Sequence, residues 1–254
     1  MSSPGKAFQN PPKVIAQSRL PAAGSLYLKG SMDFLAYIIV PLLLGLWAQF
    51  KVKSTFNRWS QVASRSGVSG AEAAAEVLRA AGVSGVEIVR VDGFLSDHYD
   101  PTKRQLALSS DNYDGTSIAA LGVAAHEAGH AIQHARAYGP LKMRSTLVPL
   151  TAVANQIAFF AILLGGFMFS QGGGGMMLNI AIGAYAVITL FTLITLPVEF
   201  DASARARTAL QASNLLAADE DRGAKEVLDA AAWTYIAAFV AALGNLAFLL
   251  SRRE

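Results

Sequence analysis

The string His126-Glu127-Ala128-Gly129-His130 carries residue types that could hydrolyse a bond with the help of a metal ion. Two histidines four residues apart project from one face of a helix, so their imidazole nitrogens can bind the same zinc ion. The glutamate after the first histidine is turned toward the open coordination position. There it can take a proton from a water molecule whose pKa the metal lowers to roughly 7. Because a peptide carbonyl is the usual target, the spacing predicts a zinc hydrolase with Glu127 as general base.

The surrounding residues predict the helix that this geometry requires. From Ser117 to about Ala137 the chain has no proline and is rich in alanine, and Ser117 or Thr116 can serve as the N-cap. Small residues such as Gly129 leave room for a substrate or another backbone, although they also serve ordinary close packing between helices. The alternative is a pair of satisfied interior histidines, and Glu127 between them argues against it.

The composition places much of the chain in lipid. Of 254 residues, 53% are hydrophobic and 15% are charged, whereas about 25% of the residues of a soluble domain are charged. About 20 apolar residues cross the ~30 Å hydrocarbon layer, and four segments predict such spans: residues 34–50, 147–170, 176–197 and 231–250. The polar tail of residues 1–33 before them is expected to be flexible, and residues 34–250 to form one domain. Without cysteine, the chain can form neither a disulfide nor a thiolate metal site.

The distribution of lysine and arginine predicts the orientation. Residues 51–146, between the first and second spans, contain eleven basic residues, whereas the loop at residues 172–175 contains none. By the positive-inside rule, the larger segment and its metal site are expected to face the cytoplasm. The basic residues of the N-terminal tail oppose this orientation. No nucleic-acid motif accounts for the basic balance, so no nucleic-acid partner is expected.

The topology also suggests the third metal ligand. An even number of spans must separate this ligand from His126, and spans two and three return the chain to Glu199. Pro197 is suited to opening a new helix there, and a carboxylate from that helix would complete a His2Glu site with one position left for water. The alternative for Glu199 is an acidic residue at a helix N-terminus, where the helix dipole favours a negative charge.

The remaining polar residues near the box are candidates for contacts with a substrate or its oxyanion. His134 is eight residues after His126, or about 12 Å along a straight helix, so the two cannot share one metal ion. It is expected to be structural, to support the ligands, or to line the substrate site. His98 and Tyr99 lie in the turn-like string SDHYDP, where a plain surface turn is the alternative.

The segment before the box predicts a small α/β layer. Residues 70–81 have helical spacing and end at Gly82, a C-cap signal. Residues 86–91 and 104–109 alternate as strands do, which predicts a short hairpin around the turn that contains His98. A strand edge beside the metal helix could bind an extended peptide, and the alternative is a hairpin that only covers the helix.

Several longer strings resemble the bacterial YugP-like neutral zinc metallopeptidases. These strings are GFLSDHYDPTKRQLALSSDNYDGTSIAALGVAAHEAGHAIQHA, PLLLGLWAQFKVKSTF, PVEFDASARA and LDAAAWTYIAA, and the similarity spans about residues 34–250. The resemblance implies a protease of the bacterial plasma membrane, distantly similar to the heat-shock membrane protease HtpX, with zinc ligands at His126, His130 and Glu199. In the HtpX-like pattern an aspartate four residues after the ligand glutamate orients the first histidine. Here that position is Ser203, so the role can pass to Asp201 or elsewhere.

Together these features predict a mainly α-helical, multi-pass membrane protein with about four transmembrane helices and a small cytosolic α/β layer of the gluzincin type. The expected partners are Zn²⁺, the lipid bilayer and protein or peptide substrates, misfolded membrane proteins among them, with a membrane-protein partner or a second copy of the chain as further candidates. The alternative is a scaffold with a structural zinc site, which would need no general base. An intramembrane protease is disfavoured because polar residues flank the box helix on both sides.

Overall fold

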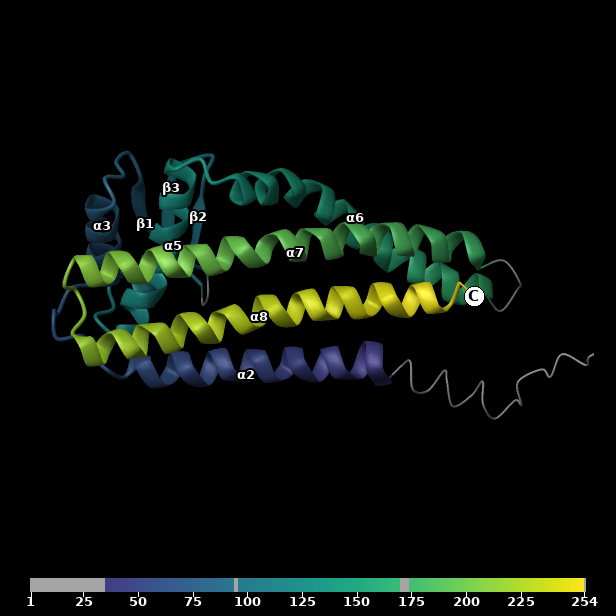
Figure 1. Ribbon diagram of the computed structural model, residues 1–254, viewed down its shortest axis with the longest axis horizontal. Coiled ribbons are helices and arrows are strands. Elements are labelled where there is room, and N and C mark those ends of the chain that lie inside the picture. Colours follow the sequence, from purple (N-terminus) through teal and green to yellow (C-terminus); the bar gives the residue numbers. More distant parts are fainter. Residues whose placement is uncertain (1–34, 94–95, 170–173, 254) are drawn as a thin grey trace, which may run out of the picture.

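The computed structural model describes residues 35–93, 96–169 and 174–253, so the expected flexible tail lies outside the described residues. A single π-helical turn, η1 (Leu35–Ile39), leads into the first of four long helices: α2 (Val40–Ser60), α6 (Gly139–Phe169), α7 (Gly175–Ala212) and α8 (Ala218–Ser251). The long helices run side by side in the order α6, α7, α8, α2, and each contacts the next (Figure 1). The predicted fold class, mainly helical with four long apolar helices and a small sheet, is confirmed.

All four long helices are long and apolar enough to cross a membrane. They extend beyond the predicted spans, however. Helix α7 has 38 residues, or about 57 Å at about 1.5 Å per residue, and the hydrocarbon layer is only ~30 Å thick. Helix α7 is therefore several turns longer than a span requires, and it contacts α5 of the α/β layer.

The expectation that a new helix begins at Pro197 is wrong, because α7 passes through this proline without a break. A proline inside a helix removes one backbone hydrogen bond. Neighbouring helices can compensate such a loss in membrane proteins, and α7 lies between α6 and α8. Glu199 is consequently an interior residue of a long helix, which excludes its interpretation as an acidic residue at a helix N-terminus.

The α/β layer lies at the end of the long helices opposite the C-terminus (Figure 1). It contains α3 (Gly70–Ala80), β1 (Glu87–Val91), β2 (His98–Asp100), β3 (Gln105–Ser109), α4 (Ser110–Tyr113) and α5 (Ile118–Ala135). Local signals set the helix ends: the Ser69 side chain accepts a hydrogen bond from the backbone of Glu72, and Gly82 has a positive φ after α3. Of the two expected N-caps of the box helix, Ser117 takes this role by accepting from the backbone of Ala120.

The sheet differs from the predicted hairpin. The two predicted strands are present as β1 and β3, but they pair in parallel. The string expected to be a turn between them provides β2, which pairs antiparallel with β3, so the strand order is β1-β3-β2. The hairpin is therefore β2–β3, and the residues His98 and Tyr99 lie on a strand at one edge of the sheet.

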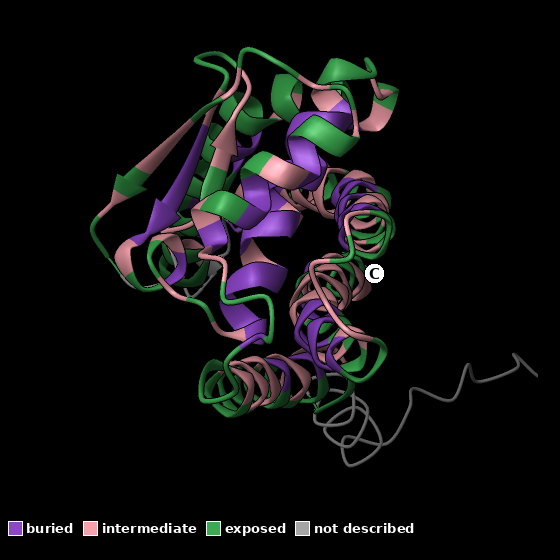
Figure 2. Ribbon diagram, turned by 90° about the vertical axis from the view of Figure 1, so that its left-hand side faces the viewer, coloured by how far each residue is buried: buried purple, intermediate pink, exposed green. Residues whose placement is uncertain are grey.

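Helix α5, which carries the HExxH box, is the centre of the main core. It packs against α3 and the sheet on one side and against α7 and α8 on the other. Buried residues are concentrated on α5, whereas the long helices show mostly intermediate and exposed residues (Figure 2). The largely buried α5 and the long α7 together carry His126, His130 and Glu199.

Candidate metal centre

Three side chains that could bind a metal ion converge between α5 and α7. One nitrogen each of His126 and His130 and one carboxylate oxygen of Glu199 all lie within 4.8 Å of one another. The Oε2 atom of Glu199 is 3.2 Å from Nε2 of His126 and 3.5 Å from Nε2 of His130. The side chains of His126, His130 and Glu199 are only 12%, 9% and 2% exposed. The structure thus brings together the three residues that the sequence suggested as ligands.

This arrangement requires a proton or a metal ion between the three side chains. Two imidazole nitrogens and a carboxylate oxygen are all acceptors when deprotonated, so they can approach only if a proton or a metal ion lies between them. Burial by itself would lower the pKa of His130, but the hydrogen bond and charge of Glu199, together with the charge of Glu127, hold that pKa above its ordinary value. A metal ion would replace the proton that the cluster attracts.

The hydrogen bonds of Gln133 determine which nitrogen of His130 is free for a metal. The Gln133 amide nitrogen donates to the carbonyl oxygen of Val198 at 2.7 Å and to Oδ2 of Asp201 at 2.8 Å. Its Oε1 atom therefore faces Nδ1 of His130, at 3.0 Å, and accepts from it. With the hydrogen on Nδ1, the lone pair of Nε2 points toward Glu199, which is the tautomer that a metal ligand needs.

Ser203 supports the other histidine. Its hydroxyl oxygen lies 3.1 Å from Nδ1 of His126 and can accept the hydrogen of that nitrogen, which leaves Nε2 for a metal. Asp201, the other residue considered for this role, lies on the His130 side. There it accepts from Gln133 and from Nε of Arg205, the latter at 2.6 Å. The donor set of two imidazoles and one carboxylate, with both imidazoles oriented by other residues, fits Zn²⁺.

A cavity of about 280 Å³ opens beside the cluster. Its lining comes from the α/β layer and from the long helices together: Asp97, His98, Tyr99, Pro101, Glu127, His130, Leu141, Arg144, Ser145, Val148, Glu199 and Tyr235. Glu127 is 9% exposed and lines this cavity together with His130. Glu127 and two of the three possible ligands, His130 and Glu199, therefore face the same cavity.

The three residues predicted to contact a substrate or its oxyanion, His98, Tyr99 and His134, lie in two places. His98 and Tyr99 line the cavity, but His134 is not among the described residues that line it. His134 instead pairs with the Tyr99 hydroxyl, 2.8 Å from its Nδ1, and so ties β2 to α5. Burial raises the pKa of Tyr99, which keeps its hydroxyl neutral and available for that hydrogen bond. His98 is exposed, and its Nδ1 lies 2.7 Å from the carbonyl oxygen of Ser96.

Three residues of the site were not singled out from the sequence. Gln133 stands three residues after His130 and so lies on the same helix face, which was an available signal. Tyr235 lies in the string LDAAAWTYIAA, which already carried the family resemblance. Arg144 was counted only as a basic residue near a membrane end, and nothing local to it indicates that α6 brings it to Glu199.

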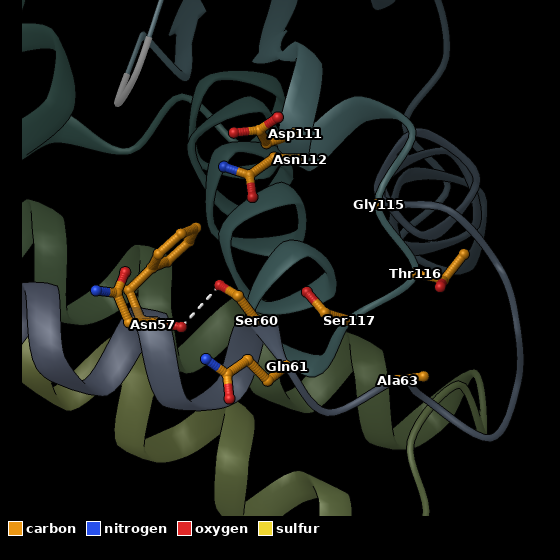
Figure 3. Close-up of a pocket in the computed structure, with 10 residues that line it drawn as sticks. Asn57, Ser60, Gln61, Ala63, Asp111, Asn112, Gly115, Thr116 and Ser117 are labelled. Atoms are coloured by element: carbon orange, nitrogen blue, oxygen red, sulfur yellow. Dashed lines mark hydrogen bonds between the residues drawn. The ribbon is translucent and has the colours of Figure 1, made fainter.

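A larger cavity, of about 570 Å³, lies elsewhere, between the end of α2 and the turn before α5 (Figure 3). Its labelled side chains are mostly amides and hydroxyls, such as Asn57, Gln61 and Ser117. Asp111 is the one carboxylate among its described lining residues, and none of them is a histidine. This lining lacks the ligand set of a zinc site, so the smaller cavity is the candidate site.

Comparisons with known proteins agree with this geometry. A family described as "Putative neutral zinc metallopeptidase" matches residues 34–253. The "Putative membrane protease YugP" of Bacillus subtilis (strain 168) is 41% identical over 215 residues, which cover 85% of this chain and 94% of the relative. No solved structure matches. The resemblance seen in the sequence is confirmed, and the chain belongs to this family of neutral zinc metallopeptidases.

Proposed function

We propose that this protein is an integral membrane zinc endopeptidase. His126, His130 and Glu199 hold the zinc ion, and Glu127 is the general base. The observation that carries the proposal is the convergence of three ligand atoms within 4.8 Å, from two different helices, beside a cavity lined by Glu127. Both histidines are oriented through Nδ1, as zinc ligands are.

The residues of the cavity account for hydrolysis of a peptide bond. When bound, zinc supplies Lewis acidity, which makes a water molecule more acidic and polarises a carbonyl oxygen. Glu127 takes a proton from the attacking water and passes it to the nitrogen of the leaving amine. Gln133 and Ser203 keep the imidazoles in one tautomer and one orientation. The proton transferred in the reaction is thus taken up and released by Glu127, and the metal ligands keep their protonation states.

The site lies where the long helices leave the membrane. Glu199 comes 24 residues after Gly175, or about 36 Å along α7, which is slightly more than the hydrocarbon thickness. We place the protein in the plasma membrane of a bacterium with the site facing the cytoplasm, because the basic residues between the first two spans favour that side. The substrates are then protein or peptide segments near the membrane surface, including parts of misfolded membrane proteins.

Strand β2 gives an extended substrate a place to bind. In the order β1-β3-β2 it is an edge strand of the described sheet, and His98 and Tyr99 from this strand line the cavity. A peptide that pairs with a strand edge is fixed through its backbone, with little demand on its sequence. This arrangement would place a scissile amide next to Glu127 and suits an enzyme that accepts varied unfolded segments.

The alternative of a scaffold with a structural zinc site is less consistent with these contacts. Structural zinc sites usually fill four ligand positions with side chains. Among the described residues, the cluster has three ligands, and the space beside it is a cavity lined by an acidic residue. A purely structural site has no use for Glu127 in that position.

The proposal is tested by incubating casein with the purified, zinc-loaded protein in detergent, beside the Glu127→Gln variant. The matched control is Glu87→Gln, which removes a carboxylate from an exposed position of strand β1. We expect cleavage by the parent and by Glu87→Gln, and loss of cleavage with retained zinc in Glu127→Gln. Equal cleavage by parent and Glu127→Gln would refute the catalytic assignment.

A further inference from the structure

Arg144 lies at the candidate site without a role in the chemistry described so far. It stands near the start of α6, and its Nη2 atom is 3.3 Å from Oε1 of Glu199. Its side chain is 30% exposed, whereas that of Glu199 is 2% exposed. The Nε atom of Arg144 is buried and has no hydrogen-bond partner among the described residues. A buried donor without an acceptor is costly, so a group absent from the chain itself is expected to satisfy it.

The charges around the cavity indicate what that group is. Among the described residues that line the cavity, Arg144 alone carries a permanent positive charge, beside the carboxylates of Glu127, Glu199 and Asp97. When water adds to a peptide carbonyl, negative charge develops on the carbonyl oxygen. Bound zinc would take part of that charge, and in a cavity lined by three carboxylates a second cationic donor would stabilise it further.

We propose that Arg144 is a catalytic residue, whose guanidinium donates a hydrogen bond to the carbonyl oxygen of the scissile peptide as negative charge develops on it. This inference rests on the proposed peptidase function. The ion pair with Glu199 holds the guanidinium beside the zinc ligands without a hydrogen bond, since Oε1 of Glu199 also has no hydrogen-bond partner among the described residues. The planar group therefore keeps its N–H donors available for the substrate oxygen. Tyr235 of α8 lines the same cavity.

A role limited to positioning Glu199 makes a different prediction. If Arg144 only held Oε1 of Glu199, its loss would weaken zinc binding, and saturating zinc would restore activity. If Arg144 contacts the reacting oxygen, its loss lowers kcat even when zinc is fully bound. A tetrahedral, negatively charged analogue of the reaction would then bind more weakly, while KM changes little.

The experiment compares the full-length parent, Arg144→Ala, Arg144→Lys and Lys142→Ala, each saturated with zinc. Lys142 is the matched control, because it is an exposed cation two residues away on the same helix and is not among the described residues lining the cavity. The readouts are bound zinc, zinc affinity, kcat and KM for a peptide copied from a mapped casein cleavage site, and the inhibition constant of the phosphonamidate analogue of that peptide.

We expect Arg144→Ala to bind zinc fully and to lose about 100-fold to about 1000-fold in kcat, with a parallel rise in the inhibition constant. Arg144→Lys keeps the charge but not the planar fork, so it should fold and still lose about tenfold in kcat. Lys142→Ala should match the parent.

Two results would overturn the inference while the proposed function stands. The first is that both zinc-saturated Arg144 variants have the kcat of the parent. The second is that kcat of the variants is low at first but returns to the parental value when the zinc concentration is raised. If Arg144→Ala does not fold, the Arg144→Lys result decides. A parent that binds zinc and cleaves no peptide would instead refute the proposed function, and the inference with it.

Discussion

Gly129 of α5 lies directly against the backbone of Ala202 in α7. A Cβ atom placed on Gly129 would be 2.4 Å from the carbonyl oxygen of Ala202, closer than such atoms approach in proteins. This close contact lets α7 run near enough to α5 for Glu199, three residues before Ala202, to reach the two histidines. The glycine inside the HExxH box thus sets the distance between the helices that carry the ligands.

Replacing this glycine should therefore disrupt the metal site. The Gly129→Ala substitution must push α7 away from α5, so we expect lower zinc affinity and a loss of about 1 to 3 kcal/mol in stability. The measurement is zinc titration together with thermal unfolding in detergent. Gly122→Ala is the matched control, since the nearest atom to its added Cβ would be 3.7 Å away, on Ala224. Parental zinc affinity in Gly129→Ala would show that the helices do not need this close contact.

Elements with local signals were predicted well, and elements that depend on distant contacts were not. The cap at Ser117 and the spacing of His126 and His130 are local, and the sequence analysis placed this helix within two residues of its observed ends. The presence of four candidate spans follows from apolar length alone. The ends of the helices do not, because α6 and α7 continue beyond the predicted spans, where they pack on each other and α7 also packs on α5. The prediction of a helix start at Pro197 failed for the same reason. Proline favours the first turn of a helix, but packing against the neighbouring helices lets α7 continue through it.

The same distinction holds for the sheet and the site. Alternating residues indicated two strands, but parallel pairing of β1 with β3 depends on a connection that passes through β2. Glu199 could be suggested from the number of spans between it and His126. By contrast, the approach of Arg144 and Tyr235 depends on how α6 and α8 pack beside α7, and no pattern within either helix encodes it.

Ser203 offers a test of how the first histidine is oriented. The Ser203→Ala substitution removes the acceptor for Nδ1–H of His126, which should lower zinc affinity or activity by about 10-fold to 100-fold. Ser203→Asp supplies a stronger acceptor at the same position and should bind zinc at least as tightly as the parent. Competition with a zinc chelator measures both. If Ser203→Ala binds zinc as the parent does, the hydroxyl does not orient His126.

Substitution of Gln133 should disturb the site more than substitution of Ser203 does, because the Gln133 side chain makes hydrogen bonds to more than one group. Gln133→Met keeps the volume of this fully buried side chain but removes the acceptor for His130 and the donor to Val198 and Asp201. We expect both weaker zinc binding, by about 10-fold to 100-fold, and lower thermal stability, since buried polar groups lose their partners. Gln211→Met, at an exposed position of α7, is the control. A stable Gln133→Met variant with parental zinc affinity would exclude this role.

Zinc affinity should decrease as the pH falls. The decrease should begin at a higher pH than it would at a site whose histidines have the ordinary pKa. Zinc needs the deprotonated nitrogen of His130, and Glu199 and Glu127 hold the pKa of this residue above its usual value. Below that pKa a proton competes with zinc, so each proton released on binding lowers the affinity by about tenfold per pH unit. Zinc titrations from about pH 5.5 to about pH 8 measure this slope. The Glu127→Gln variant should shift the onset of the decline to lower pH, because it removes one of the two carboxylates that favour the proton. The same onset in parent and variant would mean that Glu127 does not act on His130.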